Sequence, residues 1–147
     1  MDDIDRKILE ILNRDARKSF REIAKVIGVS VTTVANHISR MEKNGIINGY
    51  VPLLEPEALG YDLTALIGLK IRHGNLMEVQ KSLARDNRVF GVYDVTGGWD
   101  SIVVARFKGR KDLDRFIKNT LSADGIERTY TQIVLNVIKN EKRVLIE

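Results

Sequence analysis

Apolar residues recur at helical spacing in two segments near the start of the chain. Across residues 3–13 they stand three or four positions apart, and Asp2 or Asp3 can cap the helix that this spacing predicts. A second helix is expected after Ser19, because Glu22 lies three positions later, which is the spacing of a capping box. The inner stripes of these two helices are expected to comprise Ile4, Ile8, Ile11 and Leu12, then Phe20, Ile23, Ala24 and Ile27.

A third helical segment follows a glycine. Gly28 suits the left-handed backbone position after the second helix, where a Cβ would be unfavourable. Ser30 can then cap a helix that runs to about Asn44, with Gly45 ending it. Placed on a helical wheel, this helix turns three apolar side chains inward, Val34, Ile38 and Met41. A short helix, a glycine and a longer helix with one apolar face form the pattern of a helix-turn-helix.

The spacing of apolar residues changes after the third predicted helix, where extended segments begin. Residues 46–54 predict short strands around a turn at Asn48 and Gly49, and Pro56 and Gly60 bracket a further turn. From residue 62 onward, strand-like and helical patterns alternate in the order β-α-β-β-α-β, which is the ferredoxin-like arrangement. The expected strands are 62–72, 89–96, 101–107 and 126–138, and the expected helices are 75–86 and 110–121.

These patterns predict an α+β chain with two domains. Residues 1–50 are expected to form the helix-turn-helix domain, residues 51–61 a linker strand and turn, and residues 62–147 the ferredoxin-like domain. Both helices of a ferredoxin-like domain cover the same face of its sheet, so the opposite face needs another cover. A partner subunit is the cover that we expect.

The composition excludes several classes of protein. The 147 residues include no cysteine, so disulfides, thiolate metal sites and cysteine nucleophiles are ruled out together. No apolar run approaches the ~20 residues that cross a bilayer, and the charged N-terminus lacks the form of a secretory signal, so a cytoplasmic protein is expected. Motifs of hydrolytic, phosphate-binding or metal-dependent enzymes are missing too. No catalytic residue, metal or cofactor is therefore expected.

The outward face of the third predicted helix carries short polar side chains early and cations late. That order suits base edges near the helix N-terminus and phosphates further along. Asn36 can pair with adenine through two hydrogen bonds, and Arg40 can reach a guanine or, more readily, a phosphate. His37 lies beside the inward stripe, where a partly buried spacer is a common role. The candidate contacts to double-stranded DNA are Ser30, Thr32, Thr33, Asn36, His37, Arg40 and Lys43.

Net charge does not decide whether DNA is the partner. The chain carries 24 Lys and Arg against 20 Asp and Glu, a formal charge of +4, with a pI near 9.4. Nine of these cations and seven of these acids fall within residues 1–49, so neither half is a basic domain. DNA binding would then depend on locally placed cations. The same outward polar residues would also suit an ordinary solvated helix.

In combination, the motifs resemble those of the Lrp/AsnC, or feast/famine, family of transcriptional regulators. The likeness extends from DxxDRKILxxL at residues 2–12, through RMEKNGII at 40–47 and VTGGWD at 95–100, to TYTQIVLNVIK at 129–139. Each motif is moderately specific, whereas their combination in this order is highly specific. The resemblance implies a winged helix-turn-helix followed by an effector-binding and oligomerisation domain, the RAM domain. It also implies homodimers that assemble into tetramers or octamers.

An amino-acid effector held between dimers is a further implication of the resemblance. The family's Gly-x-x-Asp turn corresponds here to Gly97, Gly98, Trp99 and Asp100. Backbone amides at the two glycines can receive a carboxylate and the aspartate an ammonium, so the turn can hold both ends of a zwitterion. Gly-Gly between two strands is equally a hairpin turn, and the indole could contact a ligand or fill its pocket. The last predicted strand would add the polar groups of Thr129, Thr131 and Gln132.

Two other functions are compatible with parts of the sequence. An architectural protein would share the helix-turn-helix and the oligomer but would bind DNA with little sequence preference and no effector. A siroheme decarboxylase-like enzyme subunit would need clustered histidine and cationic groups around a macrocycle, and the second predicted domain has one histidine, His73. Regulation through sequence-specific DNA binding is the function that the sequence favours.

Overall fold

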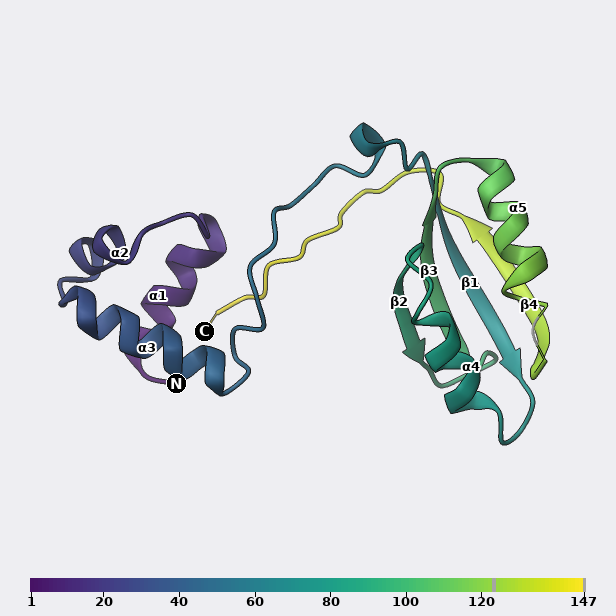
Figure 1. Ribbon diagram of the computed structural model, residues 1–147, viewed down its shortest axis with the longest axis horizontal. Coiled ribbons are helices and arrows are strands. Elements are labelled where there is room, and N and C mark those ends of the chain that lie inside the picture. The colour runs from purple at the N-terminus through teal and green to yellow at the C-terminus, as the bar shows by residue number, and fades with distance from the viewer. Residues whose placement is uncertain (123, 147) are drawn as a thin grey trace. The chain divides into compact units, whose positions relative to one another are not determined.

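The computed structural model describes residues 1–122 and 124–146, so the predicted end of the second domain at residue 147 lies outside the described residues. The chain divides into two compact units (Figure 1). One unit comprises Met1–Leu53 with Lys139–Glu147, and the other comprises Leu54–Ile138.

The C-terminal tail differs from the prediction. The sequence patterns place it in the ferredoxin-like domain, but its contacts group it with the N-terminal unit. Asn13 on the first helix donates a side-chain hydrogen bond of 2.8 Å to the backbone carbonyl of Val144. A hydrogen bond between residues so far apart in sequence has no local pattern that could predict it.

Three helices build the N-terminal unit, and they span Asp3–Arg14 (α1), Phe20–Ile27 (α2) and Val31–Lys43 (α3). Each begins at a side-chain cap, which confirms the predicted starts. Asp2 and Asp5 form a capping box at α1, and Ser19 and Glu22 form one at α2. Ser30 caps α3. The backbone donors at the start of each helix are thus partly satisfied before any tertiary contact forms.

The core of this unit lies where the three helices meet, and its buried members are Ile8, Ile23, Ala24, Val34, Ile38 and Met41. Gly28 ends α2 in the predicted left-handed conformation, with φ at 82°. Phe20, which was expected in the inner stripe, is instead 43% exposed. It is the first residue of an eight-residue helix, one turn before the residues that fill the core.

Residues 46–54 do not form the predicted strands. The backbone N–H groups of Ile46 and Ile47 both donate to the carbonyl of Met41, at 2.9 and 3.3 Å. These donors close the end of α3, so they are not available to a strand ladder. The turn predicted further along is a short 3-10 helix at Glu57–Leu59 (η1), which ends at Gly60 with φ at 79°.

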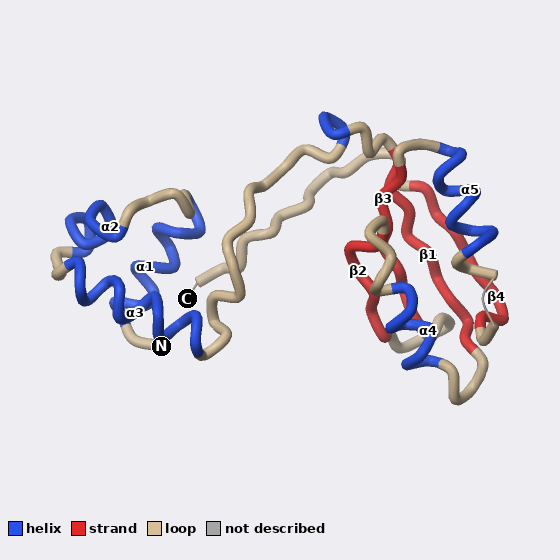
Figure 2. Tube along the Cα trace, viewed as in Figure 1, coloured by secondary structure: helices blue, strands red, loops and turns tan. Residues whose placement is uncertain are grey.

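The elements of the second unit are β1 (Leu63–Ile71), α4 (Leu76–Leu83), β2 (Val89–Asp94), β3 (Ser101–Phe107), α5 (Arg110–Asn119) and β4 (Ile126–Ile133). This order confirms the predicted ferredoxin-like arrangement. The strands form one antiparallel sheet in the order β2-β3-β1-β4, with both helices on one face (Figures 1 and 2). Among the described residues, no helix is long and apolar enough to span a membrane.

The final strand is shorter than the predicted 126–138. Its last paired residue is Ile133, opposite Ala65 near the start of β1, and Val134 then donates to the carbonyl of Thr64. Because β1 itself begins at Leu63, it cannot pair with the whole apolar pattern to residue 138, and the ladder ends while that pattern continues.

Alternation along the central strands separates a covered face of the sheet from an uncovered one. The side chains of Ile67, Leu69 and Val103 are fully buried under α4 and α5. On the opposite face Leu66 is 39% exposed and Tyr130 is 53% exposed. This uncovered face is the one that the sequence predicts to need a partner.

Candidate functional site

The outer face of α3 is the candidate DNA-reading surface. The three apolar side chains on its inner face are buried, and their packing orients the helix. Thr32, Asn36 and Lys43 are exposed on the other side, and Thr33 is half-buried. The structure therefore brings together short polar groups in the early turns and a cation in the last turn.

Ser30 and Thr33 bond to each other where α3 begins. The Oγ atom of Ser30 accepts the backbone N–H of Thr33 at 3.0 Å and lies 2.8 Å from its Oγ1. Both hydroxyls are therefore engaged in capping the helix. Thr32 and Asn36 remain the better placed of the predicted short polar groups for contact with base edges.

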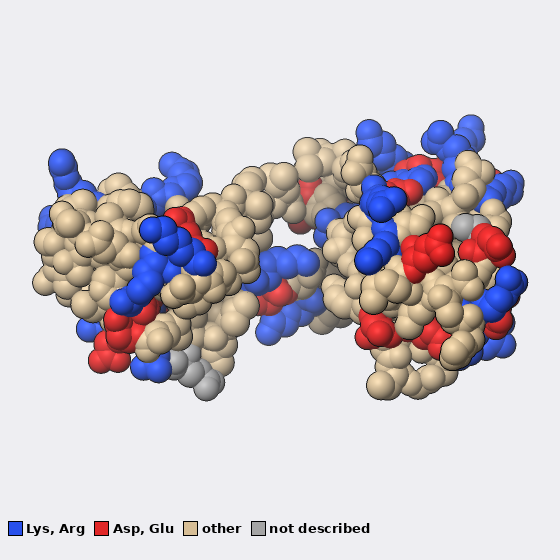
Figure 3. Space-filling model, turned by 60° about the horizontal axis from the view of Figure 1, so that its bottom comes forward, with Lys and Arg blue, Asp and Glu red and all other residues tan. Residues whose placement is uncertain are grey.

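Charged side chains of both signs are interspersed over the surface (Figure 3). That mixture agrees with the small formal charge of +4. The face shown has no large patch of one sign, so attraction of a phosphate backbone to this face would come from particular cations.

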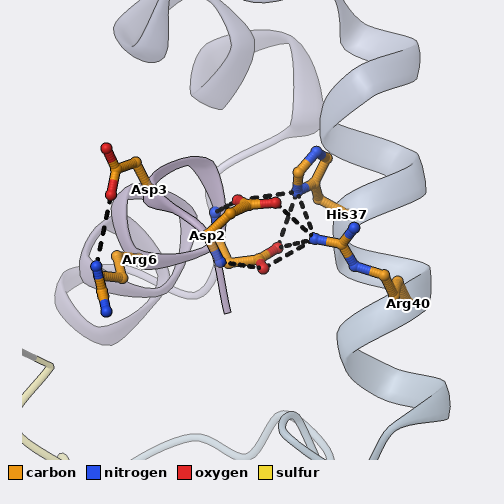
Figure 4. Close-up of polar contacts among 6 residues, drawn as sticks. Asp2, Asp3, Arg6, His37 and Arg40 are labelled. Atoms are coloured by element: carbon orange, nitrogen blue, oxygen red, sulfur yellow. Dashed lines mark hydrogen bonds and ion pairs between the residues drawn. The ribbon is translucent and has the colours of Figure 1, made fainter.

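His37 and Arg40 do not extend freely from α3. Both point from α3 toward the start of α1, where Asp2 and Asp5 lie (Figure 4). The Nη2 atom of Arg40 lies 2.9 and 2.8 Å from the two carboxylate oxygens of Asp5 and 2.9 Å from Oδ2 of Asp2. The predicted outward Arg40 is thus half exposed and paired within the protein.

Asp5 is the buried centre of this network, with a side chain only 3% exposed. Burial acts to raise the pKa of Asp5, but hydrogen bonds from the Asp2 backbone, His37 and Arg40 outweigh it and lower the pKa to about 2. A carboxylate that is ionised at neutral pH only accepts hydrogen bonds, so Nδ1 of His37, 2.8 Å away, carries the hydrogen. The sequence does contain a signal that Asp5 is buried, because Asp5 stands three positions before Ile8 and so shares the inner face of α1.

The same cluster has the outline of a metal site. Ligand atoms of Asp2, Asp5 and His37 lie within 4.8 Å of one another. Nη2 of Arg40, however, lies within 2.9 Å of the same carboxylates and already supplies a positive charge there. We therefore assign the cluster to ion pairing between the two helices.

In the C-terminal unit, Asp100 fastens the turn between β2 and β3 to β1. Its carboxylate accepts the backbone N–H of Ile71 at 2.8 Å and Nζ of Lys70 at 2.9 Å, and its own N–H donates to the Leu69 carbonyl at 2.9 Å. The hydrogen bond from Ile71, followed by that from Lys70, lowers the pKa of Asp100. The carboxylate predicted to receive an ammonium thus already has two donors, with 29% of its side chain exposed.

Trp99 folds back from the turn onto the uncovered face of the sheet. Its ring stacks with Tyr130, with centroids 5.9 Å apart and planes inclined by 15°. The guanidinium carbon of Arg128 lies 5.0 Å from the indole centroid. A Cβ on Gly68 would lie 2.8 Å from the indole. Sequence reasoning found Trp99 but missed these three neighbours, because they come from other strands.

The register of β4 places the three polar residues predicted to bind the effector on different faces of the sheet. Thr129 and Thr131 pair with Leu69 and Ile67, whose side chains lie under the helices. Gln132 is on the opposite, uncovered face. Gln132 thus lies on the other face of the sheet from the two threonines, because successive side chains of a strand point to opposite faces.

The turn itself is not part of either of two hollows in the protein surface. One hollow of about 230 Å³ lies between α1 and α2, and another of about 250 Å³ lies beside Phe90 and Arg106. Gly97 and Gly98 are exposed instead. Their amides are available to a ligand or to another protein surface.

Comparisons with known proteins agree with this arrangement. Residues 1–48 match the winged helix-turn-helix DNA-binding family, and residues 64–144 match the Lrp/AsnC ligand binding domain. The chain is 47% identical over 144 residues to an uncharacterised HTH-type transcriptional regulator of Pyrococcus horikoshii, covering 98% of this chain and 97% of that protein. It is 38% identical over 139 residues to the HTH-type transcriptional regulator FL11 of Pyrococcus furiosus, covering 95% and 92%.

Solved structures show the same fold. Escherichia coli AsnC superposes with a TM-score of 0.90 at 29% identity, over 96% of each chain. A transcriptional regulator of Neisseria meningitidis, solved in complex with L-Met, superposes with a TM-score of 0.90 at 26% identity, over 99% of this chain and 96% of that one. With its DNA-binding helix-turn-helix and its ligand-binding domain, the chain belongs to the Lrp/AsnC family of transcriptional regulators.

Proposed function

We propose that this regulator recognises a particular DNA sequence through the outer face of α3. The observation that carries the proposal is the exposed Asn36 on a helix whose inner face is buried. An asparagine amide can form two hydrogen bonds with adenine in the major groove. Thr32, one turn earlier, can contact a thymine methyl, and Lys43, in the last turn, can contact a phosphate.

The regulator acts in this proposal as a dimer, which can assemble further into a tetramer or octamer. The uncovered face of the sheet supports this, because it carries large exposed side chains, including Leu66, Tyr93 and Tyr130. Two recognition helices would enter successive major grooves. The binding site would then be roughly palindromic, with half-site centres ~10 bp or a multiple of that apart.

Selection of bound fragments from genomic DNA tests both statements. We expect enrichment of palindromic sites, with a preference of ~10³-fold or more over random DNA at physiological salt. Footprinting that protects a single unrepeated half-site would contradict the dimeric arrangement. Running the selection with and without a mixture of amino acids tests the effector at the same time.

We also propose that an amino-acid-type effector binds at the Gly97–Asp100 turn, at an interface between dimers. The match to a ligand-binding domain supports this, as does the Neisseria meningitidis relative solved with L-Met. The exposed amides of Gly97 and Gly98 can bind a carboxylate. Because Gly97 and Gly98 are exposed, a second dimer could cover a ligand bound at the turn.

Calorimetry with each of the twenty amino acids tests the effector. We expect at least one to bind, and Asp100→Asn to remove ligand-induced thermal stabilisation while DNA binding without ligand is unchanged. Asparagine is the informative replacement, because its carbonyl can still accept the Ile71 N–H that holds the turn. Absence of binding by all twenty would contradict the proposal.

An effector-free architectural protein is the second candidate function. The observation in its favour is that Asp100 is already bonded to Lys70 and Ile71, while Trp99 lies over Gly68 beside the turn. Such a protein would respond to its own concentration alone. It would show little preference between the selected sites and random DNA, and no heat on addition of amino acids.

A further inference from the structure

The contact between α1 and α3 joins a capping box to the recognition helix (Figure 4). The Asp2 carboxylate accepts the Asp5 backbone N–H at 2.9 Å, and the Asp5 carboxylate accepts the Asp2 backbone N–H at 3.0 Å. Arg40 and His37 on α3 bond to these same carboxylates. We call these four residues the α1–α3 clamp.

The centre of the clamp is buried, which separates it from an ordinary surface ion pair. Exposed pairs contribute little, because water screens them. The Asp5 side chain is 3% exposed and the His37 side chain 15%. A buried carboxylate needs its partners in place, so displacing α3 along or around its axis would leave Asp5 without them.

The clamp lies next to the residue that is best placed to read a base. His37 directly follows Asn36, and Arg40 stands one helical turn after Asn36. A helix held by its apolar stripe alone can still adjust by small rotations, whereas hydrogen bonds from two positions one turn apart set its rotation. Base contacts need such precision, because a hydrogen bond weakens steeply with misalignment.

Charge within the clamp also bears on the role of Arg40. Two carboxylates surround one guanidinium, and all three groups are ionised at neutral pH, since hydrogen bonds lower the pKa of both aspartates and raise that of Arg40. The positive charge of Arg40 is therefore already balanced inside the protein. An arginine compensated in this way adds little to the release of counterions from DNA.

We propose that Asp5 is a positioning residue for DNA recognition, and that Arg40 acts through the α1–α3 clamp rather than as a phosphate contact. The inference rests on the DNA-reading role proposed for α3. Asp5 itself need not touch DNA. It sets the orientation of Asn36 and Thr32 through the two side chains that α3 extends to it.

Asp5→Asn separates positioning from simple electrostatics. Removing a negative charge beside a DNA-binding face should strengthen binding to all DNA if charge alone matters. The clamp instead predicts a loss of about ten-fold or more in preference for the selected site over random DNA, comparable to one mismatched base pair. Binding by the untagged full chain should be measured, because residues near the N-terminus belong to the clamp.

Asp3→Asn is the matched control. Asp3 lies in the same first turn of α1 and carries the same charge, but its side chain is 88% exposed and pairs with Arg6, outside the clamp. We expect this variant to keep the wild-type preference. If Asp5→Asn binds the selected site as well as wild type, or behaves as Asp3→Asn does, the proposal is wrong.

Arg40→Gln provides a second test that does not depend on the folding of Asp5→Asn. Arg40 is half exposed, and a glutamine amide can still donate one hydrogen bond to Asp5. The clamp predicts reduced preference with little change in the salt dependence of binding. If Arg40 contacts a phosphate, the variant should instead keep its sequence preference, and the slope of log affinity against log salt should be shallower by about one. That result would overturn the proposal.

The DNA selection with wild-type protein tests the proposed function independently of these variants. If it prefers no sequence in the selection, recognition through α3 fails, and the positioning role fails with it. If wild type discriminates between sequences while Asp5→Asn and Arg40→Gln discriminate equally well, only the clamp is refuted.

Discussion

The indole of Trp99 lies flat against the backbone of Gly68, so closely that a Cβ on that glycine would be 2.8 Å from the ring. The contact fills the uncovered face of the sheet beside the turn with an aromatic side chain from the turn itself. Tyr130 and Arg128 border the same indole. The glycine is thus required on β1 for steric reasons, since only hydrogen leaves room for the ring.

Gly68→Ala should displace this indole. We expect a red-shifted tryptophan emission with stronger acrylamide quenching, and a loss of about 1–3 kcal/mol in unfolding free energy from the steric conflict. The signal is specific, because the chain contains one tryptophan. Gly98→Ala is the control, since its Cβ would meet open space at ordinary backbone angles. Wild-type emission from Gly68→Ala would show that the ring does not rest on β1.

Gly28→Ala tests the turn between α2 and α3. With φ at 82° and open space around the site, the substitution changes backbone strain and introduces no clash. We expect a loss of about 1–2 kcal/mol in unfolding free energy, measured by urea denaturation. Gly28→Asn should lose less, because asparagine tolerates the left-handed region better. Equal losses from the two variants would contradict strain as the cause.

Asn36→Ala and Lys43→Ala should have different effects on DNA binding. The first removes a base contact, so we expect about 1–3 kcal/mol of binding energy to be lost at one base pair of each half-site. The second removes a phosphate contact and should weaken all sequences alike, with a salt slope shallower by about one. Affinity for a series of single-base variants of the selected site, at several salt concentrations, distinguishes them. Uniform weakening by Asn36→Ala would make that residue a phosphate contact instead.

Lowering the pH should reduce the stability of the N-terminal unit, because this unit contains carboxylates with low pKa values. Hydrogen bonds lower the pKa values of Asp5 and Glu22 from their ordinary values of 3.8 and 4.5 to about 2. Folded-state pKa values below the unfolded ones give a stabilisation that is present above about pH 4 and is lost as the pH falls toward 2. For buried Asp5 the stabilisation is up to about 2 kcal/mol.

Urea denaturation between pH 6 and about pH 2 measures this loss. Asp5→Asn should make stability less dependent on pH in that window, whereas Asp3→Asn, with its exposed carboxylate, should leave the dependence close to that of wild type. An unchanged pH dependence in Asp5→Asn would contradict the assigned role of this carboxyl.

The helices and their ends could be predicted because their causes are local. Ser19 and Glu22 need only three residues of separation to form a capping box, and Gly28 needs only its own backbone angle. The β-α-β-β-α-β order of the second unit could likewise be predicted, because each segment shows its own strand or helix period. The strands predicted for residues 46–54 do not form, because the first backbone N–H groups of this segment donate to Met41 and not to another strand. The residues themselves suit an extended chain.

By itself, the sequence determined the order of elements, the inward faces of the helices and the likeness to one family, since periodicity and capping act over a few neighbouring residues. Only the tertiary structure decided which polar groups meet. Arg40 contacts Asp5 because two helices cross there, 35 residues apart in the chain. Thr131 lies on the covered face of the sheet and Gln132 on the uncovered one because the register of β4 on β1 decides which face each takes. Such contacts depend on how whole elements pack, and no local pattern records that.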